Sequence, residues 1–307
     1  MAKSILFIID PIQGLKKDKD TSLLLMKTSM EIGHQVFFCS HNDISLKNNI
    51  PYGKIKEVKK FDNEYPELIE RQQVNLNQLD GIFIRKDPPF NKDYLFLTIS
   101  LSLLKKPKII NCPQSLQSHN EKLSILNFPK LIPKTLVSSN LKEITQFISK
   151  YKEVVCKPID EMAGNKIFLL KKNDPNINVT LEVLTDNYST LIMIQEYIPE
   201  IRKGDKRIII VNGEPLPYGL LRIPKKTDFR GNLAKGGKAK IFKLSPSDLK
   251  LTEALKPYLI EHNLNFVGID VIGNYLTEIN ITSPTGLVEI QKLTKQNVAN
   301  TIIQNLF

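Results

Sequence analysis

The fold is decided by the stretch Val267-Gly-Ile-Asp-Val-Ile-Gly-Asn-Tyr-Leu-Thr-Glu-Ile-Asn-Ile-Thr-Ser-Pro-Thr285. Two apolar runs, 267–272 and 276–281, flank a Gly-Asn pair, and this pattern predicts a β-hairpin. Glu278 and Asn280 are two positions apart on the second strand, so their side chains share one face. Side-chain oxygens grouped in this way suit Mg²⁺, above all when phosphates complete its coordination shell.

The register of the hairpin decides whether Asp270 joins these two residues. A three-residue loop, 273–275, pairs Asp270 with Glu278, whereas a two-residue Gly-Asn turn pairs it with Thr277 and turns it to the opposite face. We expect the longer loop, and therefore a metal site made of Asp270, Glu278 and Asn280. Taken alone, these residues are explained more simply as the polar face of an edge strand, without a metal site.

The segment after this strand, 281–286, contains Thr-Ser-Pro-Thr and leads into the last helix. Backbone N–H groups at such a helix start can hold an anion. An ordinary turn with a helix cap explains the same residues, because Ser, Thr, Pro and Gly are common in turns.

Length and composition limit the class of protein. At 307 residues, the chain should hold two domains or one large multi-lobed unit. Its longest apolar runs are too short to span a bilayer, and Asp10-Pro11 ends the first run in a way untypical of a signal peptide. Cys39, Cys112 and Cys156 are widely spaced, which excludes a disulfide framework and argues against structural zinc. We expect a soluble, cytoplasmic protein without a membrane partner.

The charge balance is strongly basic: 43 Lys and Arg against 32 Asp and Glu give a net charge of +11. A positive field favours anionic partners such as nucleotides. A compositional bias toward Lys, Asn and Ile explains the charge equally well. A nucleic-acid binder should cluster Lys and Arg on one element with interleaved aromatics, and no such cluster stands out. We therefore expect no nucleic-acid partner.

The N-terminal part alternates short apolar strands with helices. Strands are predicted at 4–9, 36–39, 80–84 and 108–111, with helices at 21–32 and before Pro107. Short apolar strands separated by helices imply a parallel sheet covered on both faces.

The pattern changes near residue 115. Ser118 to Glu121 match the capping-box pattern, which predicts a short helix that carries Lys122. Helices at 140–150 and 178–186 and strands at 153–157, 166–170 and 191–198 give an α+β character. Strands dominate after residue 206, interrupted by a helix capped by Ser245 and closed by a final helix carrying Val298, Ile302 and Leu306. We expect lobes at 1–121, 122–200 and 201–307.

Three further segments carry chemistry. Lys157-Pro158 ends a strand before a loop, so a cation and backbone N–H groups there suit phosphates. Arg207, Arg222 and the Gly-rich basic loop 230–238 suit a clamp on carboxylate and phosphate, although spacing alone leaves a mobile lid and an ordinary surface loop equally open. The segment 85–90 ends a strand at the sheet edge where ligands gather in open α/β sheets. No Walker loop and no convincing dinucleotide fingerprint is present.

Together these segments resemble the prokaryotic glutathione synthetases of the ATP-grasp superfamily, over nearly the whole chain and in family order. The matching pieces are Asp10-Pro-Ile12, Arg85-Lys-Asp-Pro-Pro-Phe90, Asn120-Glu-Lys-Leu123, Lys157-Pro158, Gly204-Asp-Lys-Arg207, Arg222-Ile-Pro224, Arg230-Gly-Asn-Leu233 with Gly236-Gly237, Val267-Gly-Ile-Asp270, and Thr277-Glu-Ile-Asn-Ile-Thr-Ser-Pro-Thr285. The last three are specific.

The resemblance implies an α/β fold: an N-terminal Rossmann-like parallel-sheet lobe (pre-ATP-grasp), then a two-lobed α+β ATP-grasp domain. It implies an ATP-dependent carbon–nitrogen ligase that joins γ-L-glutamyl-L-cysteine to glycine through an acyl phosphate and releases ADP and phosphate. Mg²⁺, with Mn²⁺ as a substitute, is the implied cofactor, and a homo-oligomer, usually a tetramer, is the implied assembly. Fixed cations and metal fit this chemistry, because negative charge builds up on the transferring phosphoryl oxygens.

The resemblance also assigns residues, position by position. The implied catalytic residues are Arg207, Arg222 and Arg230, and the implied metal ligands are Asp270, Glu278 and Asn280. The implied ATP-binding residues are Lys122, Lys157, Asp160, Gly164, Gln195, Glu196, Tyr197, Ile198 and Asp205. The implied substrate-binding residues are Arg85, Gly237, Ser283, Pro284 and Thr285. The implied lid spans about 223–238 and keeps water from the acyl phosphate.

Two departures from the family pattern matter. The phosphate loop carries Glu161 and Ala163 where the family has glycines, so backbone approach to a phosphate is restricted. We expect the Glu161 carboxylate to point outward. Lys238 stands where the family often has Arg. The alternatives are another ATP-grasp carboxylate–amine ligase, a catalytically impaired nucleotide-binding homologue, or a non-catalytic binder that uses the +11 charge.

Overall fold

The computed structural model describes residues 1–16, 18–62, 65–162, 164–231, 233 and 236–307. Ala163 of the predicted phosphate loop, and Asn232, Ala234 and Lys235 of the predicted lid, lie outside these residues. None of the helices within these ranges has the length and apolar character needed to cross a bilayer.

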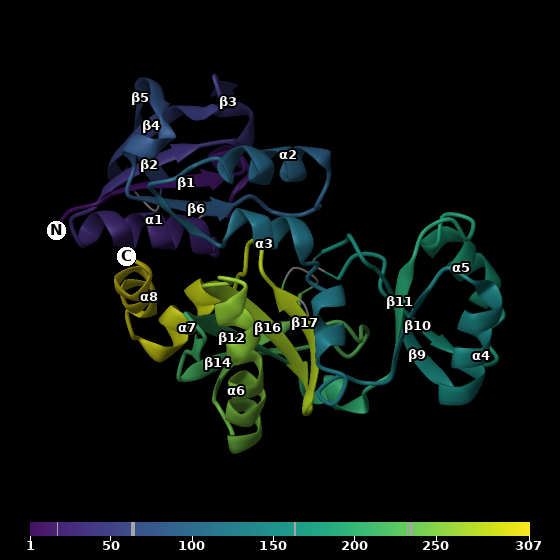
Figure 1. Ribbon diagram of the computed structural model, residues 1–307. Helices are drawn as coiled ribbons and strands as arrows, with labels where there is room; N and C mark the ends of the chain where they lie inside the picture. The colour runs from purple at the N-terminus through teal and green to yellow at the C-terminus, as the bar shows by residue number, and fades with distance from the viewer. Residues whose placement is uncertain (17, 63–64, 163, 232, 234–235) are drawn as a thin grey trace.

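The N-terminal sheet has the strand order β3-β4-β2-β1-β6-β7, with β5 paired to β4 (Figure 1). Its elements are β1 (Ser4–Ile9), α1 (Thr21–Glu31), β2 (Gln35–Cys39), β3 (Ile44–Lys47), β4 (Ile50–Asp62), β5 (Tyr65–Asn75), β6 (Gly81–Arg85), α2 (Lys92–Leu101), β7 (Lys108–Ile110) and α3 (Pro113–Ser118). The predicted parallel sheet is confirmed for β2, β1, β6 and β7. The antiparallel strands β3, β4 and β5 were not expected.

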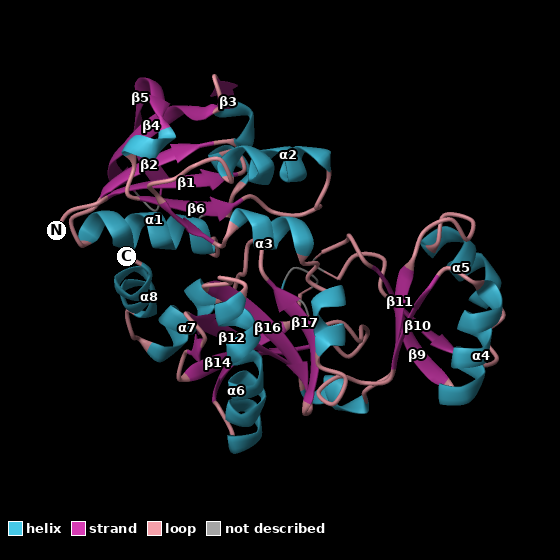
Figure 2. Ribbon diagram, in the orientation of Figure 1, coloured by secondary structure: helices cyan, strands magenta, loops and turns pink. Residues whose placement is uncertain are grey.

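The central sheet has the order β10-β9-β11-β8 and is antiparallel (Figure 2). Its elements are β8 (Thr135–Ser138), α4 (Leu141–Tyr151), β9 (Glu153–Pro158), β10 (Phe168–Lys171), α5 (Ile177–Leu184) and β11 (Ile192–Glu196). Its helices cover one face around a separate apolar cluster that includes Ile144, Cys156 and Ile194. The other face is therefore free to meet the C-terminal sheet.

The C-terminal sheet has the order β15-β14-β12-β16-β17, with β13 paired to β12. Its elements are β12 (Asp205–Val211), β13 (Glu214–Pro215), β14 (Tyr218–Ile223), β15 (Lys238–Lys243), α6 (Pro246–Glu261), β16 (Phe266–Ile272), β17 (Tyr275–Asn280), α7 (Leu287–Thr294) and α8 (Val298–Leu306). The Thr-Ser-Pro-Thr segment leads into α7, so the expectation that it enters the last helix is wrong; α8 follows as a separate element.

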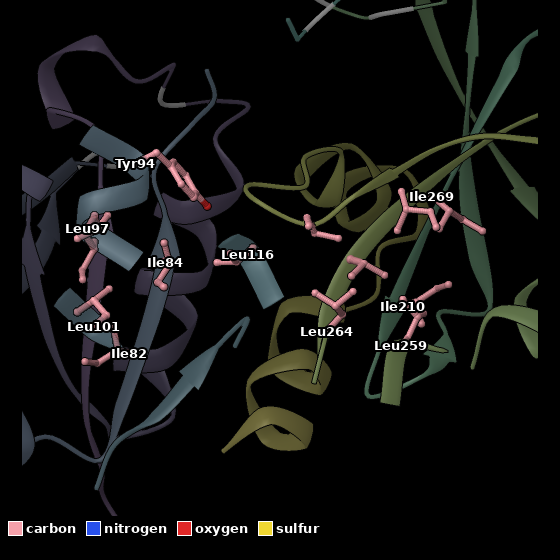
Figure 3. Packing of buried hydrophobic residues seen from close by; sticks show 14 of the residues in the cluster. Ile82, Ile84, Tyr94, Leu97, Leu101, Leu116, Ile210, Leu259, Leu264 and Ile269 are labelled. Carbon is pink, nitrogen blue, oxygen red and sulfur yellow. The ribbon is translucent and has the colours of Figure 1, made fainter. Parts of the chain in front are cut away.

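The N-terminal and C-terminal sheets share their apolar cores. One continuous cluster runs from Ile84 through Leu116 to Leu264 and Ile269 (Figure 3). At the same junction the buried Asn111 side chain donates to the carbonyls of Phe266 and Ile281, at 2.8 and 2.7 Å. Its oxygen accepts from the Phe266 N–H at 2.7 Å. These contacts join the two sheets into one packed unit.

The link between the first two sheets differs from its prediction. The short helix before Lys122 ends at Ser118, and Asn120, not Ser118, accepts from the N–H groups of Lys122 and Leu123. The carboxylate of Glu121 accepts instead from the Thr282 backbone and hydroxyl, at 3.0 and 2.8 Å. Burial raises the pKa of Glu121. The predicted capping box is therefore wrong, because the Glu121 carboxylate binds Thr282, which is distant in sequence, rather than capping a local helix.

Candidate functional site

A cavity of about 120 Å³ lies between the central and C-terminal sheets. It brings together the predicted residues Lys122, Lys157, Gly164, Gln195, Glu196, Tyr197, Ile198, Asp205, Arg230, Asp270 and Glu278. They come from both sheets and from the loops between their strands. A small-molecule site usually has about 300–1,000 Å³, so this cavity must widen to admit a nucleotide.

The acidic hairpin faces this cavity through a β-bulge. The predicted three-residue loop is wrong, because Ile272 pairs with Tyr275 across a two-residue turn. Asp270 nevertheless pairs with Glu278, since the register shifts between Asp270 and Val271 and leaves Thr277 as an extra residue. The predicted pairing of Asp270 with Glu278 is therefore confirmed, but a β-bulge produces it in place of the longer loop.

The Asp270 carboxylate is held by two arginines. Arg207 Nε–H donates to its Oδ1 at 2.6 Å and Nη2–H to its Oδ2 at 3.0 Å, and Arg222 Nη2 lies 2.9 Å from Oδ1. Burial alone would raise the pKa of Asp270, but these guanidiniums hold it well below its usual range. Asp205 also contacts Arg222, and there burial raises the carboxyl pKa. Arg207 and Arg222 themselves stand behind the cavity wall.

The donor set fits a magnesium ion bound with phosphates. Asp270 and Glu278 face each other, and the Asn280 amide lies 3.3 Å from Asp270 Oδ2. The described residues contain no cluster of three His, Cys, Asp or Glu side chains that could hold a metal by itself. Mg²⁺ commonly takes one or two carboxylates and leaves its other positions to water and phosphate oxygens, which these residues permit.

Two buried lysines bring positive charge to the same wall. Lys157 Nζ donates to the carbonyl of the bulged residue Thr277 at 3.1 Å. Burial lowers the pKa of Lys157 to about 8. Lys122 Nζ lies 3.4 Å from Glu278 Oε1 and also donates to the Glu161 carbonyl. Both amines therefore lie against the acidic hairpin, on the wall of the cavity.

The loop between β9 and β10 closes over the lysines. Arg230 Nη1–H donates to the Gly164 carbonyl at 2.9 Å, so the predicted lid touches the predicted phosphate loop. The Glu161 carboxylate pairs with Lys166 Nζ at 2.7 Å, as an outward-pointing side chain would, although the residue still lines the cavity. Asp160 is exposed and does not line it.

The cavity also has apolar lining residues, which the sequence reasoning missed. Its walls include Val155, Met162, Ile167, Ile201, Phe229 and Ile272. These lie beside Gln195 to Ile198, where β11 ends and the backbone turns away. Nothing in the sequence marks these apolar residues, because an apolar side chain on a strand reads first as core.

Gly237 lies at the end of the predicted lid and outside the cavity wall. A Cβ atom there would lie 2.5 Å from the Gly231 carbonyl oxygen, so the two ends of the loop pass too closely for a side chain. The close approach of the backbone therefore explains why this position is a glycine. The substrate contact predicted for Gly237 remains a prediction.

The predicted peptide-site residues lie behind the acidic hairpin, outside the cavity wall. Arg85 donates to the carbonyl of Pro284 through Nη1 and to Ser22 Oγ through Nε, both at 3.0 Å. Arg207 donates to the Thr285 carbonyl at 3.1 Å while holding Asp270. The turn 283–285 therefore connects the N-terminal lobe to the acidic wall.

Comparisons with known proteins agree along the chain. Residues 4–117 match the family model described as the prokaryotic glutathione synthetase N-terminal domain, and residues 121–295 match that of its ATP-grasp domain. The chain is 43% identical over 300 residues to the glutathione synthetase of Coxiella burnetii, covering 96% of this chain and 94% of the relative. It is 40% identical over 303 residues to that of Wigglesworthia glossinidia brevipalpis, covering 97% and 96%.

A likeness to solved structures concerns the fold alone. The crystal structure of D-cycloserine synthetase DcsG aligns with a TM-score of 0.69 at 12% identity, covering 98% of each chain. The macrocyclase MdnC, bound to its precursor peptide MdnA, aligns with a TM-score of 0.65 at 16% identity, covering 98% of this chain and 99% of that one.

Proposed function

The chain belongs to the prokaryotic glutathione synthetase family and is an ATP-grasp ligase that makes glutathione with ATP, and we propose that the cavity between its two antiparallel sheets is where γ-glutamylcysteine and glycine are joined. The observation that carries this assignment is the convergence of Lys122, Lys157 and Glu278 on one cavity. These side chains come from three segments far apart in sequence.

In the first step, a cysteinyl carboxylate oxygen forms a bond to the γ-phosphorus of ATP while the bond from that phosphorus to ADP breaks. Lys122 and Lys157 hold the phosphates, and Arg230 meets the charge that develops on the transferring group. Arg222 and Arg207 act from behind the wall by fixing the Asp270 carboxylate. Asp270, Glu278 and Asn280 would hold Mg²⁺, with Mn²⁺ as a substitute, which supplies charge neutralisation for the phosphates.

In the second step, the glycine nitrogen bonds to the acyl carbon, the bond from that carbon to phosphate oxygen breaks, and the amine gives up its proton. The acyl phosphate must be shielded from water until then. The loop between β14 and β15 supports this role, because its Arg230 already contacts Gly164 on the facing loop. We propose residues 223–238 as the lid.

The part of the cavity lined by apolar side chains is proposed as the adenine pocket. Gln195, Glu196, Tyr197 and Ile198 border it at the end of β11. Backbone groups there can contact a base edge while the apolar walls contact its faces. Asp160 and Gly164, on the loop between β9 and β10, are also proposed to contact the nucleotide. Asp205, at the base of the lid, is proposed to lie near it.

We also propose a cytoplasmic location and a homo-oligomer, as in the family pattern. Three free cysteines, two of them buried, support a reducing compartment. Exposed apolar side chains on α2 and in the turn after it support self-association: Phe96, Ile99 and Leu103 are 60%, 44% and 37% exposed. Light scattering on the purified protein measures the assembly directly.

The proposed function is tested by counting products. Purified protein with ATP, Mg²⁺, γ-glutamylcysteine and glycine should form one glutathione for each ADP and each phosphate. Omitting the dipeptide should stop phosphate release. Phosphate release that needs neither amino substrate contradicts the ligase assignment, and a higher kcat/KM with another peptide or amine redirects it to a different ligase.

A further inference from the structure

A second and larger hollow adjoins the catalytic cavity, beside the first half of the loop between β14 and β15. Its volume is about 980 Å³, against about 120 Å³ for the catalytic cavity. Some side chains line both spaces, so the two are neighbours: Ile167, Tyr197, Ile201, Phe229 and Arg230. Small-molecule sites usually have about 300–1,000 Å³, so this hollow has the room that the catalytic cavity lacks.

The charged side chains of the hollow are mostly cations. Its described lining contains five cationic side chains and one carboxylate: Lys166, Arg202, Lys225, Lys226, Arg230 and Asp228. The carboxylate is already neutralised, because Asp228 accepts from Arg230 Nε–H at 3.0 Å and from Nη2–H at 2.7 Å. Lys166 is paired with Glu161 at 2.7 Å. We call this space the basic hollow.

Three of these cations have no ionic partner. In the described part of the chain, the side chains of Arg202, Lys225 and Lys226 form neither a salt bridge nor a hydrogen bond. All three are exposed. Cations gathered without counterions make a positive field that reaches about 8–10 Å into solution at physiological salt and attracts anions.

Apolar side chains lie among the cations of the basic hollow. Phe168 is 39% exposed, and Leu169 and Ile223 line the same space. A base can stack on an aromatic face while cationic side chains contact its phosphates. A lining of this mixed kind suits a nucleotide better than it suits a small inorganic anion.

Arg230 connects the basic hollow with the catalytic cavity. It lines both spaces, and its Nη1–H donates to the Gly164 carbonyl at 2.9 Å. A phosphate that arrives through the hollow meets this guanidinium and can replace the carbonyl as its acceptor. The exchange is favourable, because a hydrogen bond between two charged groups is stronger than one to a neutral carbonyl.

We propose that the basic hollow is the entry site at which Mg-ATP first binds before it moves into the catalytic cavity. The inference rests on the proposed function and adds an encounter step to it. Arg202, Lys225 and Lys226 attract the anionic nucleotide from solution. Charges of this kind raise the association rate by about tenfold or more at low salt and have little effect on dissociation.

Stopped-flow binding of fluorescent N-methylanthraniloyl-ADP with Mg²⁺ tests the entry site. In the triple variant Arg202→Gln, Lys225→Gln, Lys226→Gln, the association rate constant should fall about tenfold at an ionic strength of about 0.05 M. The dissociation rate constant should stay the same. Near 0.5 M the difference from the unmodified protein should shrink to less than about twofold, because salt then screens the field.

A single variant separates this effect from a disturbance of the proposed lid. Arg202 precedes β12 and lies outside residues 223–238. Arg202→Gln alone should lower the association rate constant about threefold at low salt and leave dissociation unchanged.

The matched control removes three exposed lysines that line neither space: Lys105→Gln, Lys142→Gln, Lys250→Gln. These residues lie after α2, on α4 and on α6. The control lowers the net charge by the same amount as the triple variant. Its association rate constant should change by less than about twofold, because distant charges are largely screened.

The inference is overturned if the triple variant and the control lose association rate equally, since net charge alone would then attract the nucleotide. It is also overturned if the triple variant binds as fast as the unmodified protein at low salt, or if only its dissociation rate rises. These outcomes leave ATP-dependent ligation intact. An unmodified protein that binds no Mg-nucleotide would instead contradict the proposed function.

Discussion

The two carboxylates of the hairpin face each other but have different surroundings. Asp270 is 4% exposed and paired with two arginines, whereas the Glu278 side chain is 23% exposed and paired with Lys122. Removing one partner of a buried ion pair leaves the others uncompensated, which costs about 3–5 kcal/mol. The Glu278–Lys122 pair is less sheltered, and Lys122 also donates to the Glu161 carbonyl.

Substitutions at these two positions should therefore separate stability from activity. Glu278→Ala should abolish Mg²⁺-dependent turnover and lower the free energy of unfolding by less than Asp270→Asn does, because Lys122 keeps the Glu161 carbonyl as a partner. Asp270→Asn should also abolish turnover but lower that free energy by about 3 kcal/mol. Urea denaturation and the coupled phosphate assay measure both quantities. Near-normal turnover in Glu278→Ala would remove this residue from the site.

The buried amine of Lys157 makes nucleotide binding depend on pH. Burial lowers its pKa to about 8, so it is charged below that pH and neutral above it. Only the charged form attracts phosphate, so the affinity for Mg-ADP should fall as the pH rises from 7.5 to about 9.5. Binding at pH 9 should take up a proton, which calorimetry in buffers of different ionisation enthalpy detects.

The variant Lys157→Arg provides the contrast, because a guanidinium stays charged throughout this range. Its Mg-ADP affinity should be flat with pH, whatever its absolute value. An affinity of the unmodified protein that does not change between pH 7.5 and 9.5 would show that Lys157 does not contact the phosphates.

The unusual phosphate loop can be tested through its own ion pair. Glu161→Gly removes a carboxylate and a Cβ atom beside the phosphate-binding lysines, so KM for ATP should fall roughly threefold. Lys166→Gln leaves the Glu161 carboxylate without its partner at 2.7 Å, so KM for ATP should rise by a similar factor. Steady-state kinetics measure both. Changes in the same direction would show that the Glu161 charge does not act on the nucleotide.

At the residue scale, the sequence predicted polar groups well and apolar ones poorly. Eleven of the candidate residues line the cavity. Residue patterns alone singled out Lys157, Arg230, Asp270 and Glu278, because charged groups at strand ends or in a Gly-rich loop have few structural reasons to be there. Others, such as Gln195, Tyr197 and Ile198, came only from the family resemblance. Met162, Phe229 and Ile272 were not predicted.

At the element scale, the backbone of the loop between β14 and β15 passes close to neighbouring residues at Gly231. A Cβ atom on Gly231 would lie 2.7 Å from the Arg222 carbonyl oxygen and 2.8 Å from Asp205 Cβ. Gly231→Ala should therefore displace the base of the lid, lower kcat roughly tenfold and raise phosphate released per glutathione above one.

The matched control is Gly14→Ala, where an added Cβ would meet nothing within 4 Å. It should leave kcat and the product ratio unchanged. Full coupling of phosphate release to glutathione in Gly231→Ala would show that this loop does not protect the acyl phosphate.

Element prediction succeeded where burial sets the pattern. The strands of the parallel sheet are continuous apolar runs, and β1, β2 and β6 were expected from them. The ribbon of β4 and β5 was not, because much of it is exposed and carries cross-strand pairs such as Lys56–Glu70 and Lys60–Glu67. The bulge at Thr277 was also not predicted, since its register depends on the partner strand.

At the scale of the whole molecule, the three sheets form two packed units. The N-terminal and C-terminal sheets share apolar clusters and the Asn111 bridge. The central sheet has a cluster of its own on its helix-covered face, and Met193 on β11 joins the shared cluster. We propose lobe boundaries at 1–121, 122–200 and 201–307. Their relative placement was beyond the sequence, because it rests on contacts between residues such as Asn111 and Phe266, 155 positions apart.

The closed cavity follows from this arrangement. Lys122 donates to the Glu161 carbonyl and Arg230 donates to the Gly164 carbonyl. Two carbonyls of the loop between β9 and β10 therefore bind the cationic side chains that we propose for the nucleotide. ATP must therefore exchange with these two carbonyls when it binds.

The central claim is that this cavity phosphorylates the cysteinyl carboxylate of the dipeptide. Isotope transfer tests it most directly: γ-glutamylcysteine labelled with ¹⁸O in the cysteinyl carboxylate is converted with ATP and glycine, and the released phosphate is analysed by mass spectrometry. The account predicts one ¹⁸O atom in each phosphate for each glutathione formed. Unlabelled phosphate, released while glutathione accumulates, would contradict it.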